Sequence, residues 1–525
     1  MTEQVEAAKG TEQEGDDNNK FLSRELVGSI PWAIGSRFVL FFVYLLASVV
    51  IVRGLGKESY GVYRLCTNIA EYLLIICCLG LNTALMRFVP ELRVMKSKAG
   101  LTRLLTKTAL SQVAMLLPVG LLLYALKPYL DDWLFKGNSH FLLLFTMVVL
   151  AGRLGRTFSE DVLTALFRMR AVSILAVVYG VLWLGVTVVA LKYYPSPHTA
   201  LLSQAGALFF VAIWGAIVLI KLLRGLDWTE STEGIGMRRV LGIALPRQLN
   251  QAASLITQQY SEIFFIGYFF VPGTVAIYEM GNWLPFVLIT FLPMAVHKLF
   301  TSGFAEAYSR NPDCLGRLVT SYYKALILLV IPVSAFGAFF ATDAIRVLYG
   351  EEMIEAGPVA SAFFIIHLLP LISIPLGVAL VTKEKILHMQ PLLIMMIVVN
   401  LTFDWIFISR YGVVGACIAI VATFALTIPI RLYVVSRLIG GIYFPLRFFL
   451  KLLGLLLGLA FLFSLLVSSP GFVVLAALTI AYLVTYVALL RGLRLIHPDD
   501  IAEIREMGFT RLNRVLDALV VRKKS

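Results

Sequence analysis

The sequence contains few of the residues that support enzyme chemistry in a soluble protein. Its 525 residues include six histidines without metal-ligand spacing, and five cysteines that form no C-x-x-C pair. The segment GLGKESYG at 54–61 lacks the spacing of a phosphate loop and its final Ser or Thr. These absences argue against metal chemistry and direct ATP hydrolysis, so we expect no cofactor.

Charged residues are also scarce, because they make up 15% of the chain whereas hydrophobic residues make up 59%. The mean hydropathy of +0.85 leaves no room for a sizeable soluble domain. Apolar segments of about 20 residues are long enough to cross a bilayer as helices. The sequence predicts an all-α polytopic membrane protein with about 14 spans, at approximately 32–52, 62–86, 107–126, 140–162, 171–191, 199–221, 243–270, 274–297, 320–340, 357–381, 388–408, 412–432, 449–468 and 471–490.

The 45 Lys and Arg residues are distributed unevenly over the connecting loops. Most lie at the two ends of the chain and in the even-numbered loops, and few lie in the odd-numbered loops. Because basic residues near span ends stay in the cytoplasm, we expect a multi-pass protein of the bacterial inner membrane with both termini cytoplasmic. This topology accounts for most of the net charge of +13, so we expect no nucleic-acid partner.

An internal repeat predicts two similar halves. GVYR at 61–64 recurs as AIYE at 276–279, and a second weak match lies at a similar offset before the fourth and tenth spans. Two matches at one offset indicate two six-helix lobes in parallel orientation, related by an axis along the membrane normal. The predicted parts are a polar cytoplasmic N-terminus with the start of an interfacial helix, an N-lobe, a C-lobe, two additional spans and a cytoplasmic amphipathic tail, at 1–26, 27–225, 226–440, 441–490 and 491–525 respectively.

The fourth span carries cations that its apolar run is too short to exclude. The clean run at 141–152 cannot cross about 30 Å of hydrocarbon, so Arg153, Arg156 and Glu160 lie in or near the membrane. Their spacing of three and four puts them on one helix face. That face should meet water or protein. The alternative is that the arginine side chains extend to the cytoplasmic headgroups.

The seventh span is rich in polar residues before a short apolar run. Arg247, Gln251, Gln258 and Glu262 lie in it, and the last three follow a helical spacing that puts them on one face. Such a face suits a hydrated lumen with sugar hydroxyls. A seam of hydrogen bonds between helices is the structural alternative.

Intramembrane acids are candidates for ion coupling. Glu71 lies deepest by its position in the second span, with Arg64 two turns away on the same face, so a neutralising Arg64–Glu71 pair is an equal alternative. Asp404 lies closer to the outer surface. Arg37 in the first span faces either the lumen or the headgroups.

Several segments are familiar as a set. They are RGLGKESYGVY at 53–63, GLNTALMRFVPEL at 80–92, VAIYEMGNW at 275–283, VLYGEEMIEAGPV at 347–359 and RYGVVGACIA at 410–419. The chain resembles, over roughly 25–440, the Wzx-like polysaccharide biosynthesis flippases of the multidrug/oligosaccharidyl-lipid/polysaccharide exporter superfamily. The resemblance implies two lobes around a cavity that opens alternately to each side. It also places a cationic lumen on Arg37, Arg64, Arg153, Arg156, Arg247 and Lys298.

The resemblance implies transport of an undecaprenyl-pyrophosphate-linked oligosaccharide from the cytoplasmic to the periplasmic leaflet, and not enzymatic activity. Membrane lipids, a polysaccharide polymerase and assembly proteins are the implied partners. The Gln-rich seventh span departs from the family pattern and leaves the coupling residue open among Glu71, Glu262 and Asp404. A multidrug cation antiporter, a lipid II flippase and a membrane glycan polymerase remain as alternatives.

Overall fold

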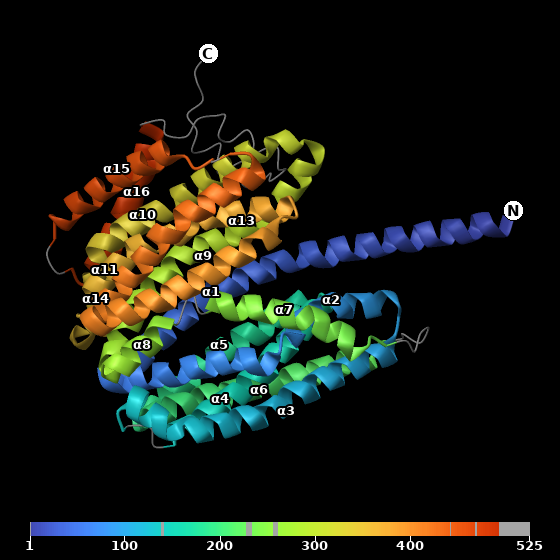
Figure 1. Ribbon diagram of the computed structural model, residues 1–525, viewed down its shortest axis with the longest axis horizontal. Helices are drawn as coiled ribbons and strands as arrows, with labels where there is room; N and C mark the ends of the chain where they lie inside the picture. Colours follow the sequence, from blue (N-terminus) through green and yellow to red (C-terminus); the bar gives the residue numbers. More distant parts are fainter. Residues whose placement is uncertain are drawn as a thin grey trace, which may run out of the picture. The chain divides into compact units, whose positions relative to one another are not determined.

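The computed structural model describes residues 2–137, 141–226, 234–255, 261–441, 443–467 and 470–492. Within these residues the secondary structure is helical, without strands (Figure 1). Eleven helical segments are long and apolar enough to cross a membrane. The prediction of an all-α polytopic membrane protein is therefore confirmed. The predicted amphipathic tail lies outside the described residues from position 493 onward.

The chain divides into two compact units, Met1–Leu255 and Ile256–Ser525, here called unit 1 and unit 2. Unit 1 contains α1 (Thr2–Cys78), α2 (Leu81–Val94), α3 (Lys98–Leu130), a π-helical turn (Asp131–Phe135), α4 (Leu142–Ala165), α5 (Met169–Tyr193), α6 (Pro197–Arg224) and α7 (Met237–Leu255). Unit 2 contains α8 (Ser261–Phe269), α9 (Pro272–Arg310), α10 (Leu315–Tyr349), α11 (Ala356–Ile366), α12 (Leu368–Leu371), α13 (Ser373–Thr382), α14 (Gln390–Ile439), α15 (Leu446–Ser464) and α16 (Phe472–Gly492), with short 3₁₀ turns at Pro312–Cys314, Glu351–Met353 and Ile386–Met389.

Two glycines divide the two longest helices. Gly56 in α1 has φ 75° and ψ 173°, and Gly412 in α14 has φ 56° and ψ −131°. Both have a positive φ, which an L-residue with a side chain rarely adopts. Gly56 lies between the predicted first and second spans, and Gly412 begins the predicted twelfth span. Helix α1 therefore contains the first span and most of the second, and α14 contains most of the eleventh and all of the twelfth. The predicted seventh span corresponds to α7 and α8.

Serine caps fix the starts of two spanning helices. The Ser97 hydroxyl accepts a hydrogen bond from the Gly100 amide at 3.2 Å at the start of α3. Ser196 does the same for the Thr199 amide at the start of α6, where Pro197 occupies the first helical position. These caps satisfy amides that the helix itself leaves without an acceptor.

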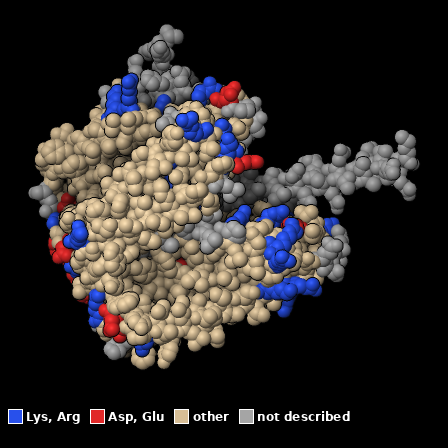
Figure 2. Space-filling view, viewed as in Figure 1, with Lys and Arg blue, Asp and Glu red and all other residues tan. Residues whose placement is uncertain are grey.

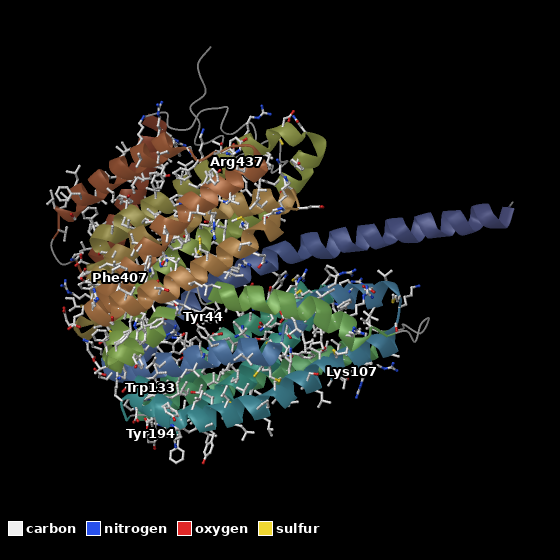
Figure 3. All side chains as sticks on the ribbon, viewed as in Figure 1. Tyr44, Lys107, Trp133, Tyr194, Phe407 and Arg437 are labelled. Atoms are coloured by element: carbon white, nitrogen blue, oxygen red, sulfur yellow. The ribbon has the colours of Figure 1, made fainter. Side chains whose placement is uncertain are left out.

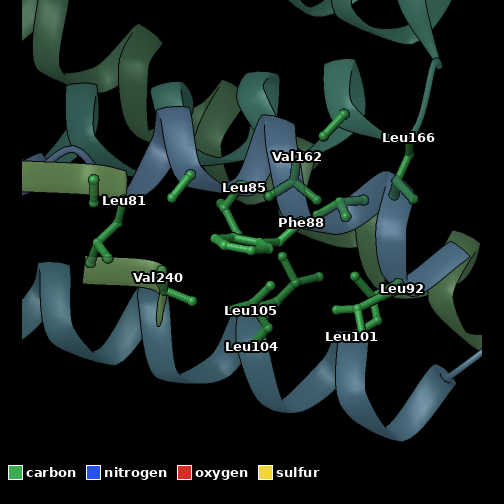
Figure 4. Packing of buried hydrophobic residues seen from close by; sticks show 14 of the residues in the cluster. Leu81, Leu85, Phe88, Leu92, Leu101, Leu104, Leu105, Val162, Leu166 and Val240 are labelled. Carbon is green, nitrogen blue, oxygen red and sulfur yellow. The ribbon is translucent and has the colours of Figure 1, made fainter. Parts of the chain in front are cut away.

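One core cluster of unit 1 joins α2 to α3, α4 and α7 (Figure 4). Phe88 of α2 is fully buried within it, and Val240 and Ala244 of α7 complete one side. Gly80 permits the approach of α7, because a Cβ at this position would lie 2.1 Å from the Ala244 carbonyl oxygen. Apolar packing of this kind makes large-to-small changes costly, about 3–5 kcal/mol for Phe to Ala.

In unit 2, α10 is the central helix. Small residues permit close contact with α11: a Cβ on Gly337 would meet the Phe364 ring, and a Cβ on Gly357 would meet Thr342. Close contact between small residues is a common basis of helix association in membranes. On another side, α10 packs against α15 and α16, and the Tyr486 hydroxyl donates to the Leu328 carbonyl at 2.8 Å. The two helices that follow the predicted C-lobe, α15 and α16, therefore belong to unit 2 and pack against α10.

The surface carries its charge mainly near helix ends, and the face in view is largely uncharged between them (Figure 2). In unit 1, Lys107 lies toward one end, whereas Trp133 and Tyr194 lie at the opposite end (Figure 3). Exposed Lys and Arg residues near the Lys107 end include Arg103 and Arg239. Apolar flanks with charged ends suit helices that cross a bilayer.

Candidate functional site

Arg153 of α4 is paired with a carboxylate from the second span. Its Nη1 donates to Glu71 Oε1 of α1, and the two side chains are 16% and 32% exposed. Glu71 thus has a partner from another span, and the Arg64–Glu71 pair stays an untested alternative. A separation of seven residues corresponds to about 10 Å along a helix, which a Glu side chain does not span readily, whereas α4 packs directly beside α1.

Arg156 is held by a carboxylate and an aromatic ring. Its Nε donates to Glu160 Oε1 at 2.8 Å, one turn further along α4. Its guanidinium carbon lies 3.9 Å from the centre of the Tyr179 ring of α5. A cation over an aromatic face is stabilised by the ring quadrupole, and more so where water is scarce. Arg156 is 18% exposed, so both arginines contact protein within unit 1.

Aromatic and amide side chains extend this cluster across α1, α5 and α6. Tyr179 stacks on Trp183 with ring centres 6.0 Å apart, and Trp183 also contacts Tyr44 of α1. The Tyr63 hydroxyl of α1 donates to Gln204 Oε1 at 3.3 Å, and Gln204 Nε2 lies 3.5 Å from the Tyr179 hydroxyl. The sequence analysis did not predict these residues as part of a site. The four-residue spacing of Tyr179 and Trp183, which puts both rings on one face of an apolar helix, is the sequence feature that could have identified two of them.

We call this group the arginine cluster, defined by Glu71, Arg153, Arg156, Glu160 and Tyr179. The positive charges of its two arginines equal the negative charges of its two glutamates, and charges inside a membrane helix bundle are usually paired in this way. Each guanidinium has five N–H donors in a planar fork that also fits a phosphate. The cluster can therefore exchange a carboxylate for a phosphate at each arginine.

The other predicted substrate-binding residues differ in their exposure. Arg37 on α1 and Arg247 on α7 are exposed, and so is Gln251 on α7. Arg64 is half-buried on α1, beside Tyr63. Lys298 belongs to α9 in unit 2, where the position of its side chain is not described. Gln258 lies outside the described residues.

A second polar group lies in unit 2, where α8 packs against α14. The Ser261 hydroxyl is 2.9 Å from Asp404 Oδ2 and 3.1 Å from Asn400 Oδ1. Glu262 follows Ser261 on α8 and is buried, as are Tyr278 of α9 and Asn400 of α14. We call this group, Ser261, Glu262, Tyr278, Asn400 and Asp404, the acidic cluster.

The acidic cluster holds two buried carboxylates and no basic side chain among the described residues that form it. Glu262 is 5% exposed and Asp404 is fully buried. Within the described part of the chain, Asp404 Oδ1 accepts no hydrogen bond. Two buried carboxylates close together cannot both remain ionised without a compensating cation. This arrangement can bind a proton or a small cation.

The acidic cluster changes the order of the coupling candidates. The sequence position of Glu71 suggested the deepest acid, but that carboxylate is neutralised by Arg153 and is partly exposed. Asp404, which the sequence placed nearer the outer surface, is the more buried acid. Gln251 is exposed and Glu262 is buried, and the predicted common face of Gln251, Gln258 and Glu262 stays a prediction.

The comparisons with known proteins agree with this architecture. A family model described as "Polysaccharide biosynthesis protein" matches residues 29–297. The solved structure of "Lipid II flippase MurJ, inward closed conformation" is similar with a TM-score of 0.64 and 14% identity, over 88% of this chain and 98% of that chain. An inward-facing multidrug resistance MATE family transporter of the MOP superfamily is similar with a TM-score of 0.62 and 18% identity, over 78% of this chain and 98% of that chain. At these identities the likeness shows the fold. No curated protein matches the chain.

Proposed function

The chain belongs to the polysaccharide biosynthesis protein family, and from this premise we propose that it is a flippase for an undecaprenyl-pyrophosphate-linked oligosaccharide. The proposed movement is from the cytoplasmic to the periplasmic leaflet of a bacterial inner membrane, by alternating access and with both termini cytoplasmic. The observation that carries the proposal is the arginine cluster, in which Arg153 and Arg156 lie three residues apart on one helix within the membrane-spanning part of unit 1.

A lipid pyrophosphate with a polar glycan needs compensating groups to leave the headgroup region. Arg153 and Arg156 offer two forks that match phosphate oxygens in bidentate fashion. Glu71 and Glu160 hold these forks in place and neutralise them. The pyrophosphate would replace the carboxylates at the guanidinium groups. Tyr179 holds the Arg156 guanidinium from one face, so the fork keeps its orientation during the exchange.

The acidic cluster is the proposed coupling site. A proton or cation bound by Glu262 and Asp404 would change the net charge of a buried group, and any difference in its affinity between two conformations shifts their populations. The energy of an ion gradient could thereby drive the movement of the lipid. Polymerase and assembly proteins are the proposed partners that receive the product.

Complementation of a flippase-null strain tests the function. Replacing Arg153 and Arg156 together by Gln should abolish surface polysaccharide while the protein remains in the membrane, and Lys at both positions should restore part of the activity because charge remains but the fork is lost. Arg103→Gln, an exposed change on α3, is the matched control and should keep full activity. Full activity of the double Gln variant would refute a role of the arginine cluster in transport.

A strain depleted of its lipid II flippase tests whether lipid II is the substrate instead. The fold similarity to MurJ makes lipid II the most direct competing substrate. Growth of the depleted strain on this chain, with no restored surface polysaccharide in the first strain, would assign lipid II as the substrate and refute the proposed oligosaccharide.

A further inference from the structure

Arg431 near the end of α14 is half-buried, and its described contacts differ from those of Arg153 and Arg156. Its Nη1 donates to the Ser373 hydroxyl of α13 at 2.6 Å, and its Nη2 lies 3.8 Å from the Met396 sulfur on the first half of α14. Both contacts are to neutral groups, so neither compensates the positive charge.

Three arginines elsewhere in the membrane-spanning helices have acidic partners. Arg153 pairs with Glu71, Arg156 with Glu160, and Arg346 of α10 with Asp343 at 3.3 Å. Among the described residues, Arg431 has no carboxylate within ion-pair distance. A partly buried charge is costly when it is not paired, and a guanidinium offers five donors, of which the described contacts use two. The geometry around Arg431 is therefore that of a cation site that lacks its anion.

The neighbouring surface is apolar, which favours a lipid over a soluble anion. Ile372, one residue before Ser373, lines a narrow apolar crevice with a volume of about 20 Å³. The crevice is otherwise formed by aliphatic and aromatic residues of α10 and α12, by Phe444 before α15 and by Phe449 in α15. A lipid carries a phosphate and hydrocarbon chains in one molecule, so it satisfies both features.

We propose that Arg431 and the Ser373 hydroxyl bind the phosphate of a membrane lipid on unit 2. The phosphate accepts from the free donors of the guanidinium, and the hydroxyl turns its own proton toward a phosphate oxygen while it still accepts from Nη1. The lipid is either a polyprenyl pyrophosphate or an anionic phospholipid. The proposal does not depend on the flippase assignment, because either lipid could occupy the site in a protein with another cargo.

Native mass spectrometry of the detergent-purified full chain tests this site. The probes are undecaprenyl pyrophosphate, phosphatidylglycerol, and diacylglycerol as the lipid without phosphate. Arg431→Gln should lower the bound fraction of a phosphate-bearing probe about tenfold, the usual scale for a lost charge-assisted hydrogen-bond pair. Arg437→Gln is the matched control, because Arg437 lies on the same helix and is exposed, with a contact to the Tyr433 hydroxyl (Figure 3).

The pattern of loss identifies the lipid. Loss confined to undecaprenyl pyrophosphate supports the site with the polyprenyl lipid as its ligand, and equal loss of phosphatidylglycerol supports it with a phospholipid headgroup. Equal binding of both probes by wild type and Arg431→Gln would overturn the proposal.

A purely structural role for Arg431 predicts a different result. In that case Ser373→Ala, which removes the neutral partner, should lower the melting temperature as much as Arg431→Gln and leave lipid binding unchanged in both variants. If Arg431→Gln does not fold, amide hydrogen exchange of the wild-type protein, measured with each of the three lipids, tests the lipid site instead. Protection of 426–437 by a phosphate-bearing lipid and not by diacylglycerol supports the site, and equal exchange with all three lipids refutes it.

Discussion

The guanidinium of Arg156 on α4 lies 3.9 Å from the ring centre of Tyr179 on α5. The same ring stacks on Trp183, so the arginine rests on a support that is itself fixed by packing. A charged side chain with three or four flexible bonds would otherwise adopt many rotamers. The contact therefore fixes the orientation of the guanidinium fork.

The first prediction concerns that ring. Tyr179→Leu should lower transport strongly and destabilise the protein by about 2 kcal/mol, because a buried cation–π contact is lost. Tyr179→Phe keeps the ring and loses only a long contact to Gln204, so it should retain most activity. Polysaccharide export and the melting temperature measure both effects. Equal loss in the two variants would assign the effect to the hydroxyl and not to the ring.

The second prediction concerns the acids that neutralise the arginine cluster. Glu160→Gln removes the charge that competes with a phosphate at Arg156, so a short-chain polyprenyl pyrophosphate should bind about tenfold tighter, or about 1.4 kcal/mol. The apoprotein should become less stable because a half-buried arginine loses its charged partner. Titration calorimetry and thermal unfolding measure the two changes.

Glu91→Gln is the control for this exchange, because Glu91 pairs with Arg87 and Arg239 away from the arginine cluster. Its affinity for the pyrophosphate should equal that of the wild type. Weaker binding by Glu160→Gln would mean that the carboxylate orients Arg156 for the lipid and does not compete with it.

The third prediction separates the two groups of acids. Asp404→Asn and Glu262→Gln mimic the protonated forms, so transport in proteoliposomes should lose its response to an imposed proton or sodium gradient while lipid binding remains. Glu71→Gln should keep the gradient response, because Glu71 is already neutralised by Arg153. The opposite result, with only Glu71→Gln insensitive to the gradient, would return the coupling role to unit 1.

The fourth prediction concerns topology. In a variant without native cysteines, Tyr194→Cys should react with an impermeant maleimide in intact cells, whereas cysteines at Met1 and Ser525 should not. Tyr194 is 73% exposed, and its replacement leaves the Ser196 cap intact. Labelling of either terminus in intact cells would reverse the orientation that the charge distribution predicts.

Hydropathy and spacing predict much of this molecule, and tertiary contacts account for what they miss. The apolar segments locate the spanning helices, and the short run before Arg153 identifies the cationic face of α4. Whether Arg64 or Arg153 meets Glu71 depends on how α4 packs beside α1, which no local pattern encodes. Ser261 and Asp404 are 143 residues apart in the chain and meet only where α8 packs on α14. The boundary between the two predicted lobes, after residue 225, stays a prediction. The boundary between the two compact units lies at Leu255.

The core of unit 1 can be completed only late in the synthesis of that unit. Val240 and Ala244 complete the cluster around Phe88, yet they follow all six spans of the predicted N-lobe in the chain. When the sixth span leaves the insertion machinery, the surface at Gly80 and α2 that packs against Ala244 is still uncovered. The newly inserted N-terminal half therefore waits in the membrane with an open apolar face until translation has passed Ala244, and this interval is when a chaperone or insertase would have most to protect.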